Sequence, residues 1–130
     1  YGSIVCDSGA SFGDAVTIGT GLGLVVSKSV LMPLITANQL IYALSKIGYR
    51  SAEFFIQAST AGGAYEALKI VALHDGTNTW NTQYGVVRSG ASLGTYTTII
   101  GGSGGNFLRL RVTPTTVNTT YKVMVTALPV

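Results

Sequence analysis

Residues 65–88 read YEALKIVALHDGTNTWNTQYGVVR, and this stretch decides the fold. Its first ten residues alternate, so that a period of two places Leu68, Ile70 and Ala72 on one face of a strand. The tetrad DGTN at 75–78 is the strongest hairpin signal in the chain, because Asp-Gly accepts the positive φ angles of a tight reversal. The residues after it return as a second strand, and the stretch therefore predicts an antiparallel hairpin.

Working outward, strand signals recur on both sides of this hairpin, separated by turns rich in Gly, Asn and Pro. Residues 39–45 also fit a helical period through Leu40, Ile41 and Leu44, and we predict a strand there. The predicted strands cover residues 39–45, 49–59, 65–74, 80–88, 95–100, 107–113 and 121–128. About seven strands joined by short turns predict an all-β fold, an antiparallel β-sandwich that is jelly-roll-like.

The chain divides in composition near residue 35. Residues 1–35 hold short apolar pieces interrupted by Gly, too brief to bury a core of their own, whereas the regular strand pattern occupies residues 36–130. We predict an N-terminal strand-forming arm and a sandwich domain, respectively. Because the apolar pieces would be prone to aggregation if exposed, we expect the arm to pack on neighbouring copies, by adding strands to their sheets or by exchange.

Composition excludes several classes of protein. The chain has 130 residues, of which 47% are hydrophobic and only 10% charged, a balance that excludes charge-rich disorder and coiled coils. The net charge of +3 is scattered, so we do not expect nucleic acid as a partner. The longest apolar run, residues 30–35, is far shorter than the ~20 residues of a membrane-spanning helix, and no membrane insertion is predicted.

Side chains that carry chemistry are few. The single histidine, His74, is followed by Asp75, but neighbours on a strand point to opposite faces, and we expect the pair to cap the turn or lie at the surface. Glu53 and Glu66 have no partner motif, and we expect both on solvated faces. The lone Cys6 has no metal-site spacing. We therefore predict no catalytic residue, no metal and no cofactor, and an enzyme is the weakest of three hypotheses.

Aromatic and basic residues are the remaining candidates for contact with a ligand or partner. The aromatic set can stack sugar rings or fill a core or interface, and we favour core or interface. Arg109 and Arg111 share one face of a predicted strand, where they either bind an acidic glycan or phosphate or keep the sheet soluble. The aromatic set is Tyr65, Trp80, Tyr84, Tyr96 and Tyr121. The candidate contact residues are Trp80, Tyr84, Arg109 and Arg111.

An ordered series of short motifs resembles a known domain. The series is YRSA at 49–52, LHDGT at 73–77, QYG at 83–85, SLGT at 92–95 and LRLRVTP at 108–114. It resembles the β-rich virion structural module that recurs in tail, neck and fibre proteins of tailed bacteriophages, notably cyanophages. The resemblance covers about residues 38–130.

The resemblance implies a function in the virion, without an active site. We expect a non-enzymatic structural or assembly protein of a tail, fibre, neck or capsid-surface element, located in the virion. Its partners would be further copies of itself, with a trimer favoured, and other virion proteins. The alternative is a carbohydrate-binding module that recognises a receptor glycan on the host surface.

Overall fold

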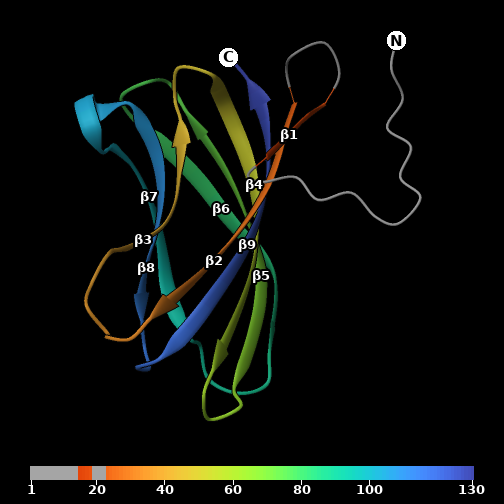
Figure 1. The fold of residues 1–130 in the computed structure, drawn as a ribbon, viewed down its shortest axis with the longest axis vertical. Coiled ribbons are helices and arrows are strands. Elements are labelled where there is room, and N and C mark those ends of the chain that lie inside the picture. The colour runs from red at the N-terminus through yellow and green to blue at the C-terminus, as the bar shows by residue number, and fades with distance from the viewer. Residues whose placement is uncertain (1–14, 19–22) are drawn as a thin grey trace.

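The structure is a computed structural model that describes residues 15–18 and 23–130. In these residues, nine strands form two antiparallel sheets that face each other as a sandwich (Figure 1). The strands are β1 (Ala15–Ile18), β2 (Gly23–Met32), β3 (Gln39–Ser45), β4 (Tyr49–Thr60), β5 (Tyr65–His74), β6 (Thr79–Arg88), β7 (Gly94–Gly101), β8 (Phe107–Pro114) and β9 (Thr119–Pro129). The predicted all-β antiparallel sandwich is confirmed, and β3 to β9 correspond to the seven predicted strands.

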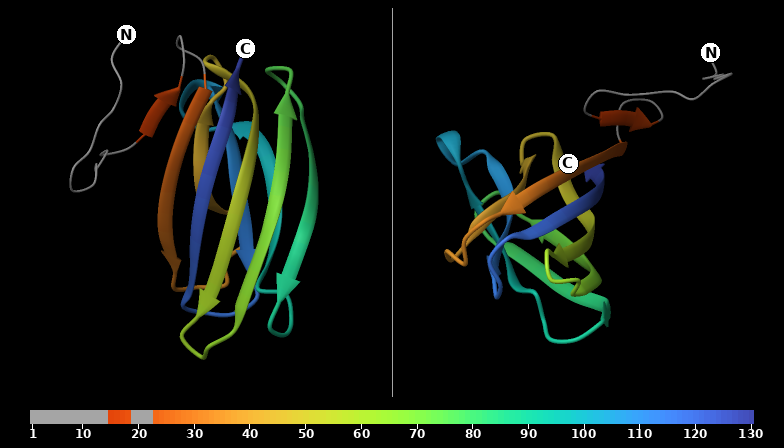
Figure 2. Two further views of the ribbon diagram at one scale, coloured as in Figure 1. Left: turned by 90° about the vertical axis from the view of Figure 1, so that its right-hand side faces the viewer. Right: turned by 60° about the horizontal axis from the view of Figure 1, so that its bottom comes forward.

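The two sheets differ in width. One has six strands in the order β1-β2-β9-β4-β5-β6, and the other has three in the order β3-β8-β7. Figure 2 (left) shows the six strands side by side in front of the narrower sheet. A three-residue 3-10 turn, Ser103–Gly105, is the helical element of the described part, and no helix there has the length and apolar character needed to cross a membrane.

The core lies between the sheets and is built from alternate residues of each strand. Phe54 and Ile56 on β4 are fully buried, as are Leu108 and Leu110 on β8. The intervening residues on both strands are more exposed, as the period of two requires. The inward phase predicted for residues 107–113 is confirmed.

A β-bulge explains the ambiguous pattern in β3. Leu40 pairs with Arg111 and Tyr42 with Leu110, so the register shifts at Ile41. An extra residue at this point places Ile41 and Leu44 on the same buried face although they are three positions apart. This spacing resembles a helical period in the sequence, and the strand prediction is confirmed.

The strand β2 changes the description of the N-terminal segment. Residues 23–32 were expected in an arm that packs on neighbouring copies, but Leu24 to Met32 pair with β9 of the same sheet. Val26 and Met32 are buried in the domain's own core. The expectation is therefore corrected for this part of the arm, since ladder hydrogen bonds and core burial are already available within the chain. Cys6 and the other residues of 1–14 and 19–22 lie outside the described residues.

The DGTN hairpin between β5 and β6 has the predicted geometry. Gly76 has a φ of 101°, which favours glycine, and the Asp75 N–H donates to the Asn78 carbonyl at 3.2 Å. The N–H groups of Asn78 and Thr77 donate to the Asp75 carboxylate at 2.7 and 2.8 Å, and these bonds lower the pKa of Asp75.

His74, at the end of β5, supports the same turn. It is buried, its Nδ1 accepts the Gly76 N–H at 3.0 Å, and its Nε2 lies 2.6 Å from the Tyr49 carbonyl oxygen. These contacts assign Nδ1 as the acceptor and Nε2 as the donor. The predicted role in turn capping is confirmed, and the ring lies inside the fold rather than at its surface.

Candidate functional site

The outer face of the six-stranded sheet is the candidate functional site. The alternate residues that point away from the core include a group of large apolar side chains that remain well exposed. In this group Trp80 is 53% exposed, Met124 52% and Leu73 45%. The group consists of Phe55, Val71, Leu73, Trp80, Tyr84, Met124 and Leu128. Apolar side chains gathered on one sheet face are typical of a surface that becomes covered.

Cross-strand pairing arranges these side chains in rows. Phe55 on β4 pairs with Met124 on β9. Leu73 on β5 pairs with Trp80 on β6. This second row lies four residues along β5 from Lys69, the partner of Phe55. Because paired residues on one face lie about 5 Å apart, each row begins with an apolar contact across two neighbouring strands. The first row continues from Phe55 to Lys69 on β5, and the second from Leu73 to Ser51 on β4.

A polar group lies beside Phe55 and between the two rows. The Tyr84 hydroxyl donates to Glu53 Oε2 at 2.8 Å, and Lys69 Nζ lies 3.2 Å from Glu53 Oε1. The hydrogen bond from Tyr84, followed by the contacts with Lys69, lowers the pKa of Glu53, and the same hydrogen bond raises the pKa of Tyr84. The negative and positive charges at the centre of the face are therefore paired with each other.

The outer face of the six-stranded sheet has shallow depressions between its exposed side chains. One of about 330 Å³ lies beside Phe55 and Met124, across β2, β9 and β4. A second, of about 370 Å³, lies beside Val71 and Leu128. Side chains of an opposing surface can insert between these residues, which favours packing of two surfaces over binding of a single small molecule.

The four candidate contact residues divide between opposite sides of the molecule. Trp80 and Tyr84 lie on β6, on the outer face of the six-stranded sheet. Arg109 and Arg111 alternate with buried leucines on β8 and lie on the outer face of the three-stranded sheet. The sandwich lies between the two pairs, so they do not contribute to one ligand site.

The aromatic set divides as well. Tyr121 is fully buried, and Tyr96 packs against the core with its ring edge-to-face on Tyr121, at a centroid distance of 6.2 Å. Tyr65 is exposed, as are Trp80 and Tyr84. Only part of the set therefore fills the core.

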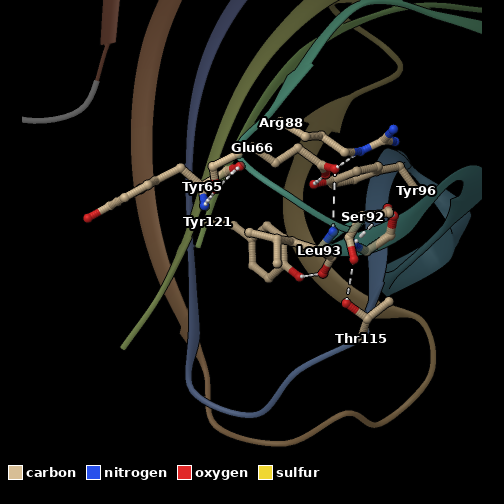
Figure 3. A network of polar contacts seen from close by, with 10 residues as sticks. Tyr65, Glu66, Arg88, Ser92, Leu93, Tyr96, Thr115 and Tyr121 are labelled. Carbon is tan, nitrogen blue, oxygen red and sulfur yellow. Dashed lines mark hydrogen bonds and ion pairs between the residues drawn. The ribbon is translucent and has the colours of Figure 1, made fainter. Parts of the chain in front are cut away.

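Glu66 is the main polar residue that sequence reasoning misplaced. It was expected on a solvated face, but only 2% of its surface is exposed, and its carboxylate lies at the centre of a polar network (Figure 3). The carboxylate accepts from Arg88 Nε, from the Tyr96 hydroxyl at 3.0 Å and from the Leu93 N–H at 3.3 Å. The correction has a clear cause, because these three donors make burial of the charge tolerable.

The network links the loop between β6 and β7 to both sheets. Besides its bond to Glu66, Leu93 accepts at its carbonyl from the Tyr121 hydroxyl at 2.7 Å. The Thr115 hydroxyl, after β8, donates to the Ser92 carbonyl at 2.7 Å. Both carboxylate oxygens of Glu66 accept a hydrogen bond. Together, the bonds of Glu66, Leu93 and Ser92 hold the loop against both sheets at one end of the sandwich.

Burial in this network changes the acidity of two tyrosines. Burial, and then the nearby Glu66 carboxylate, raises the pKa of Tyr121 to about 12. The same two causes, in that order, raise the pKa of Tyr96 well above its usual range. Both hydroxyls are thus held in the neutral form that can donate a hydrogen bond.

Gly94 is required by the close packing beside this network. A Cβ at this position would lie 2.6 Å from Val112 Cγ2 and 3.1 Å from the Tyr121 hydroxyl. We predict that Gly94→Ala lowers the free energy of unfolding by about 1–3 kcal/mol, the usual cost of overpacking, in urea denaturation. Gly90→Ala is the control, because its Cβ would meet nothing within 4 Å. Equal stability of the two variants would contradict the prediction.

Metal-ligating residues do not cluster in the part of the chain that the structure describes. His74 is engaged by the hairpin, and Glu66 by its three donors. The described carboxylates thus have structural contacts or, for Glu53, contacts on the exposed face.

Comparisons with known proteins add little to this description. No protein-family model matches the chain, and no curated protein matches it. A similar solved structure is the crystal structure of the Acinetobacter phage vB_ApiP_P1 tailspike protein, with a TM-score of 0.48 and 12% identity over 98% of this chain. The chain spans 26% of that tailspike chain. The resemblance to a virion module therefore stays a prediction.

Proposed function

We propose that this chain is a non-enzymatic structural module of a tailed-bacteriophage virion and that it acts by association with further copies of itself. The contact surface is the outer face of the six-stranded sheet. The observation that carries the proposal is the pair of exposed apolar rows on that face, formed around Phe55 with Met124 and Leu73 with Trp80. The motif resemblance of residues 38–130 supports the assignment to a virion.

The size of the face suits a stable interface. Strands β2, β9, β4, β5 and β6 lie side by side at about 4.8 Å, and β4 and β5 are paired from residue 51 to residue 59. These spacings give a face of roughly 24 by 27 Å, or about 650 Å² before side-chain relief is counted. A standard interface buries about 800 Å² on each partner, so this single face nearly supplies it.

The charge of the face favours a copy of the same chain as its occupant. A face with charges of one sign would repel an identical face. Here the central Glu53 is paired with Lys69 and Tyr84 within each copy, and the rows on either side are apolar. Lys122 on β9, beside Phe55 and Met124, adds one positive charge to each face. Like-charge repulsion between identical faces is therefore limited to this lysine, and closed symmetric oligomers are the usual result. Two identical faces in contact form a two-fold symmetric dimer, so the trimer favoured from the sequence would require this face to contact a different surface of the next copy.

A charge placed in the apolar row tests the proposal. We expect Leu73→Lys to raise the dissociation constant of the oligomer by at least about 100-fold, equivalent to about 2.7 kcal/mol, because the new ammonium group would be buried without a partner. The measurement is sedimentation velocity over a series of concentrations, with circular dichroism to verify folding.

Ile99→Lys is the matched control. Ile99 is 40% exposed, close to the 45% of Leu73, but it lies on β7, on the outer face of the three-stranded sheet. We expect this variant to assemble like the unchanged chain. A monomeric unchanged chain at micromolar concentration, or equal weakening by both lysines, would contradict the proposal.

A further inference from the structure

We propose that the outer face of the three-stranded sheet binds an acidic polysaccharide through Arg109 and Arg111. The inference is independent of self-association, because it concerns the opposite side of the sandwich. Both arginines lie on β8, the central strand of that sheet. The buried residues between and beside them, Leu108 and Leu110, direct the arginine side chains outward.

The backbone sets the spacing of the two guanidinium groups. Positions two apart on a strand point to the same side and are about 7 Å apart. Flanking strands enclose the pair, since Arg109 lies between Ala43 and Ile99, and Arg111 between Leu40 and Thr97. The residues on both sides are small, aliphatic or hydroxyl-bearing, so a flat polymer can lie across the strands.

The positive charge of this face is uncompensated. None of β3, β7 and β8 contains an Asp or Glu. The ion pairs found among the described residues, Lys69 with Glu53 and Arg88 with Glu66, belong to the six-stranded sheet. Arg109 and Arg111 therefore have no carboxylate partner within the described part of the chain, and an external anion can take that place.

Unused hydrogen-bonding capacity points to the same position. Arg111 Nε and Thr97 Oγ1 are buried and have no hydrogen-bond partner among the described residues. Thr97 and Arg111 are directly paired across β7 and β8, so the two unpartnered atoms belong to neighbouring side chains on one face. Buried donors without an acceptor are unusual in folded proteins, and a bound carboxylate would engage the guanidinium that carries one of them.

The sparse charge distinguishes an acidic polysaccharide from nucleic acid. Arginine binds carboxylate groups bidentately, and the exposed Thr95 hydroxyl on the same face suits a polymer of hydroxyl-bearing sugars. Nucleic acid is held by many phosphate contacts and by aromatic stacking. The three strands hold only two cations, both arginines, which is fewer than the many phosphate contacts of a nucleic-acid site. Acid groups separated by neutral hydroxyls therefore fit this face best.

The proposal is tested on the full chain by isothermal titration calorimetry with oligosaccharides of alginate. Alginate is a polymer of uronic acids. Neutral dextran serves as the uncharged comparison. We expect alginate to bind, dextran not to bind, and the affinity to fall as salt screens the charges. The double variant Arg109→Gln/Arg111→Gln should weaken alginate binding at least about tenfold. Lys28→Gln/Lys122→Gln removes the same charge from β2 and β9 and should keep the affinity.

Each other outcome overturns the site. Absence of alginate binding does so directly. Equal weakening by the two double variants would show attraction by net charge alone. Tighter binding of a single-stranded oligonucleotide that depends on the two arginines would show the wrong ligand class. If the glutamine variant fails to fold, Arg109→Lys/Arg111→Lys replaces it: retention of full affinity would overturn the bidentate contact that the proposal requires.

Discussion

Glu66→Ala is expected to lower the free energy of unfolding by about 3–5 kcal/mol, a large share of the stability of a domain of this size. The substitution leaves Arg88, the Tyr96 hydroxyl and the Leu93 N–H without their common acceptor. Because only 2% of the Glu66 surface is exposed, removal of the side chain also leaves a cavity in the domain. Urea denaturation followed by the fluorescence of Trp80, the single tryptophan, measures the effect.

Glu53→Ala is the control, because Glu53 makes an ion pair of similar composition on an exposed face. Exposed pairs contribute little, so we expect a change below about 1 kcal/mol. If Glu66→Ala does not fold, Glu66→Gln keeps the shape and can be measured instead. A loss in the Glu66 variants no larger than that in Glu53→Ala would show that the network does not hold the sandwich together.

Stability is expected to fall steeply above pH 10. Burial and the Glu66 carboxylate raise the pKa of Tyr121 to about 12, and they raise the pKa of Tyr96 further. In the unfolded chain both tyrosines ionise near pH 10, whereas the folded chain keeps their protons. Their stabilising contribution is therefore complete below pH 10 and is lost as the pH rises toward the folded-state pKa, by about 1.4 kcal/mol per pH unit for each tyrosine.

Tyr121→Phe should remove one of the two contributions. We expect the slope of unfolding free energy against pH between 10 and 12 to drop from about 2.7 to about 1.4 kcal/mol per unit. Tyr84→Phe removes an exposed tyrosine whose raised pKa comes mainly from a solvent-screened hydrogen bond to Glu53, so it should change the slope less than Tyr121→Phe does. A flat profile in this range, or an equal effect of the two substitutions, would contradict the assignment of the slope to the buried pair.

Local features of the chain were predictable because they depend on neighbouring residues. The alternation of Leu68, Ile70 and Ala72 and the DGTN reversal determine strand, face and turn without any distant contact. The candidate site was partly predictable in the same way. The outward phase of Arg109 and Arg111 follows from their strand alone, whereas the aromatic set, which includes Trp80 and Tyr84, was favoured for core or interface. A contact role for these four residues stays a prediction.

The burial of Glu66 was indicated by its strand phase, but the usual preference of carboxylates for solvent led to the opposite prediction. Glu66 has the same phase on β5 as Leu68, which points inward. The general preference of carboxylates for solvent argued against burial. The donors that reverse this preference, Leu93 and Tyr96, lie about 30 positions away in the chain and reach Glu66 only after the sheets pack. A pattern of neighbouring residues does not contain such contacts.

By itself, then, the sequence determined the strands from residue 39 onward, the turns and the alternation of most strands, because a period of two and the φ preference of Gly76 are local properties. Only the tertiary structure decided which strands share a sheet. The pairing of β2 with β9 drew residues 23–32 into the sandwich, and the placement of β6 and β8 in different sheets separated Trp80 from Arg109. The physical reason is that strand partners are chosen by long-range packing and ladder hydrogen bonds, which join residues far apart in the chain.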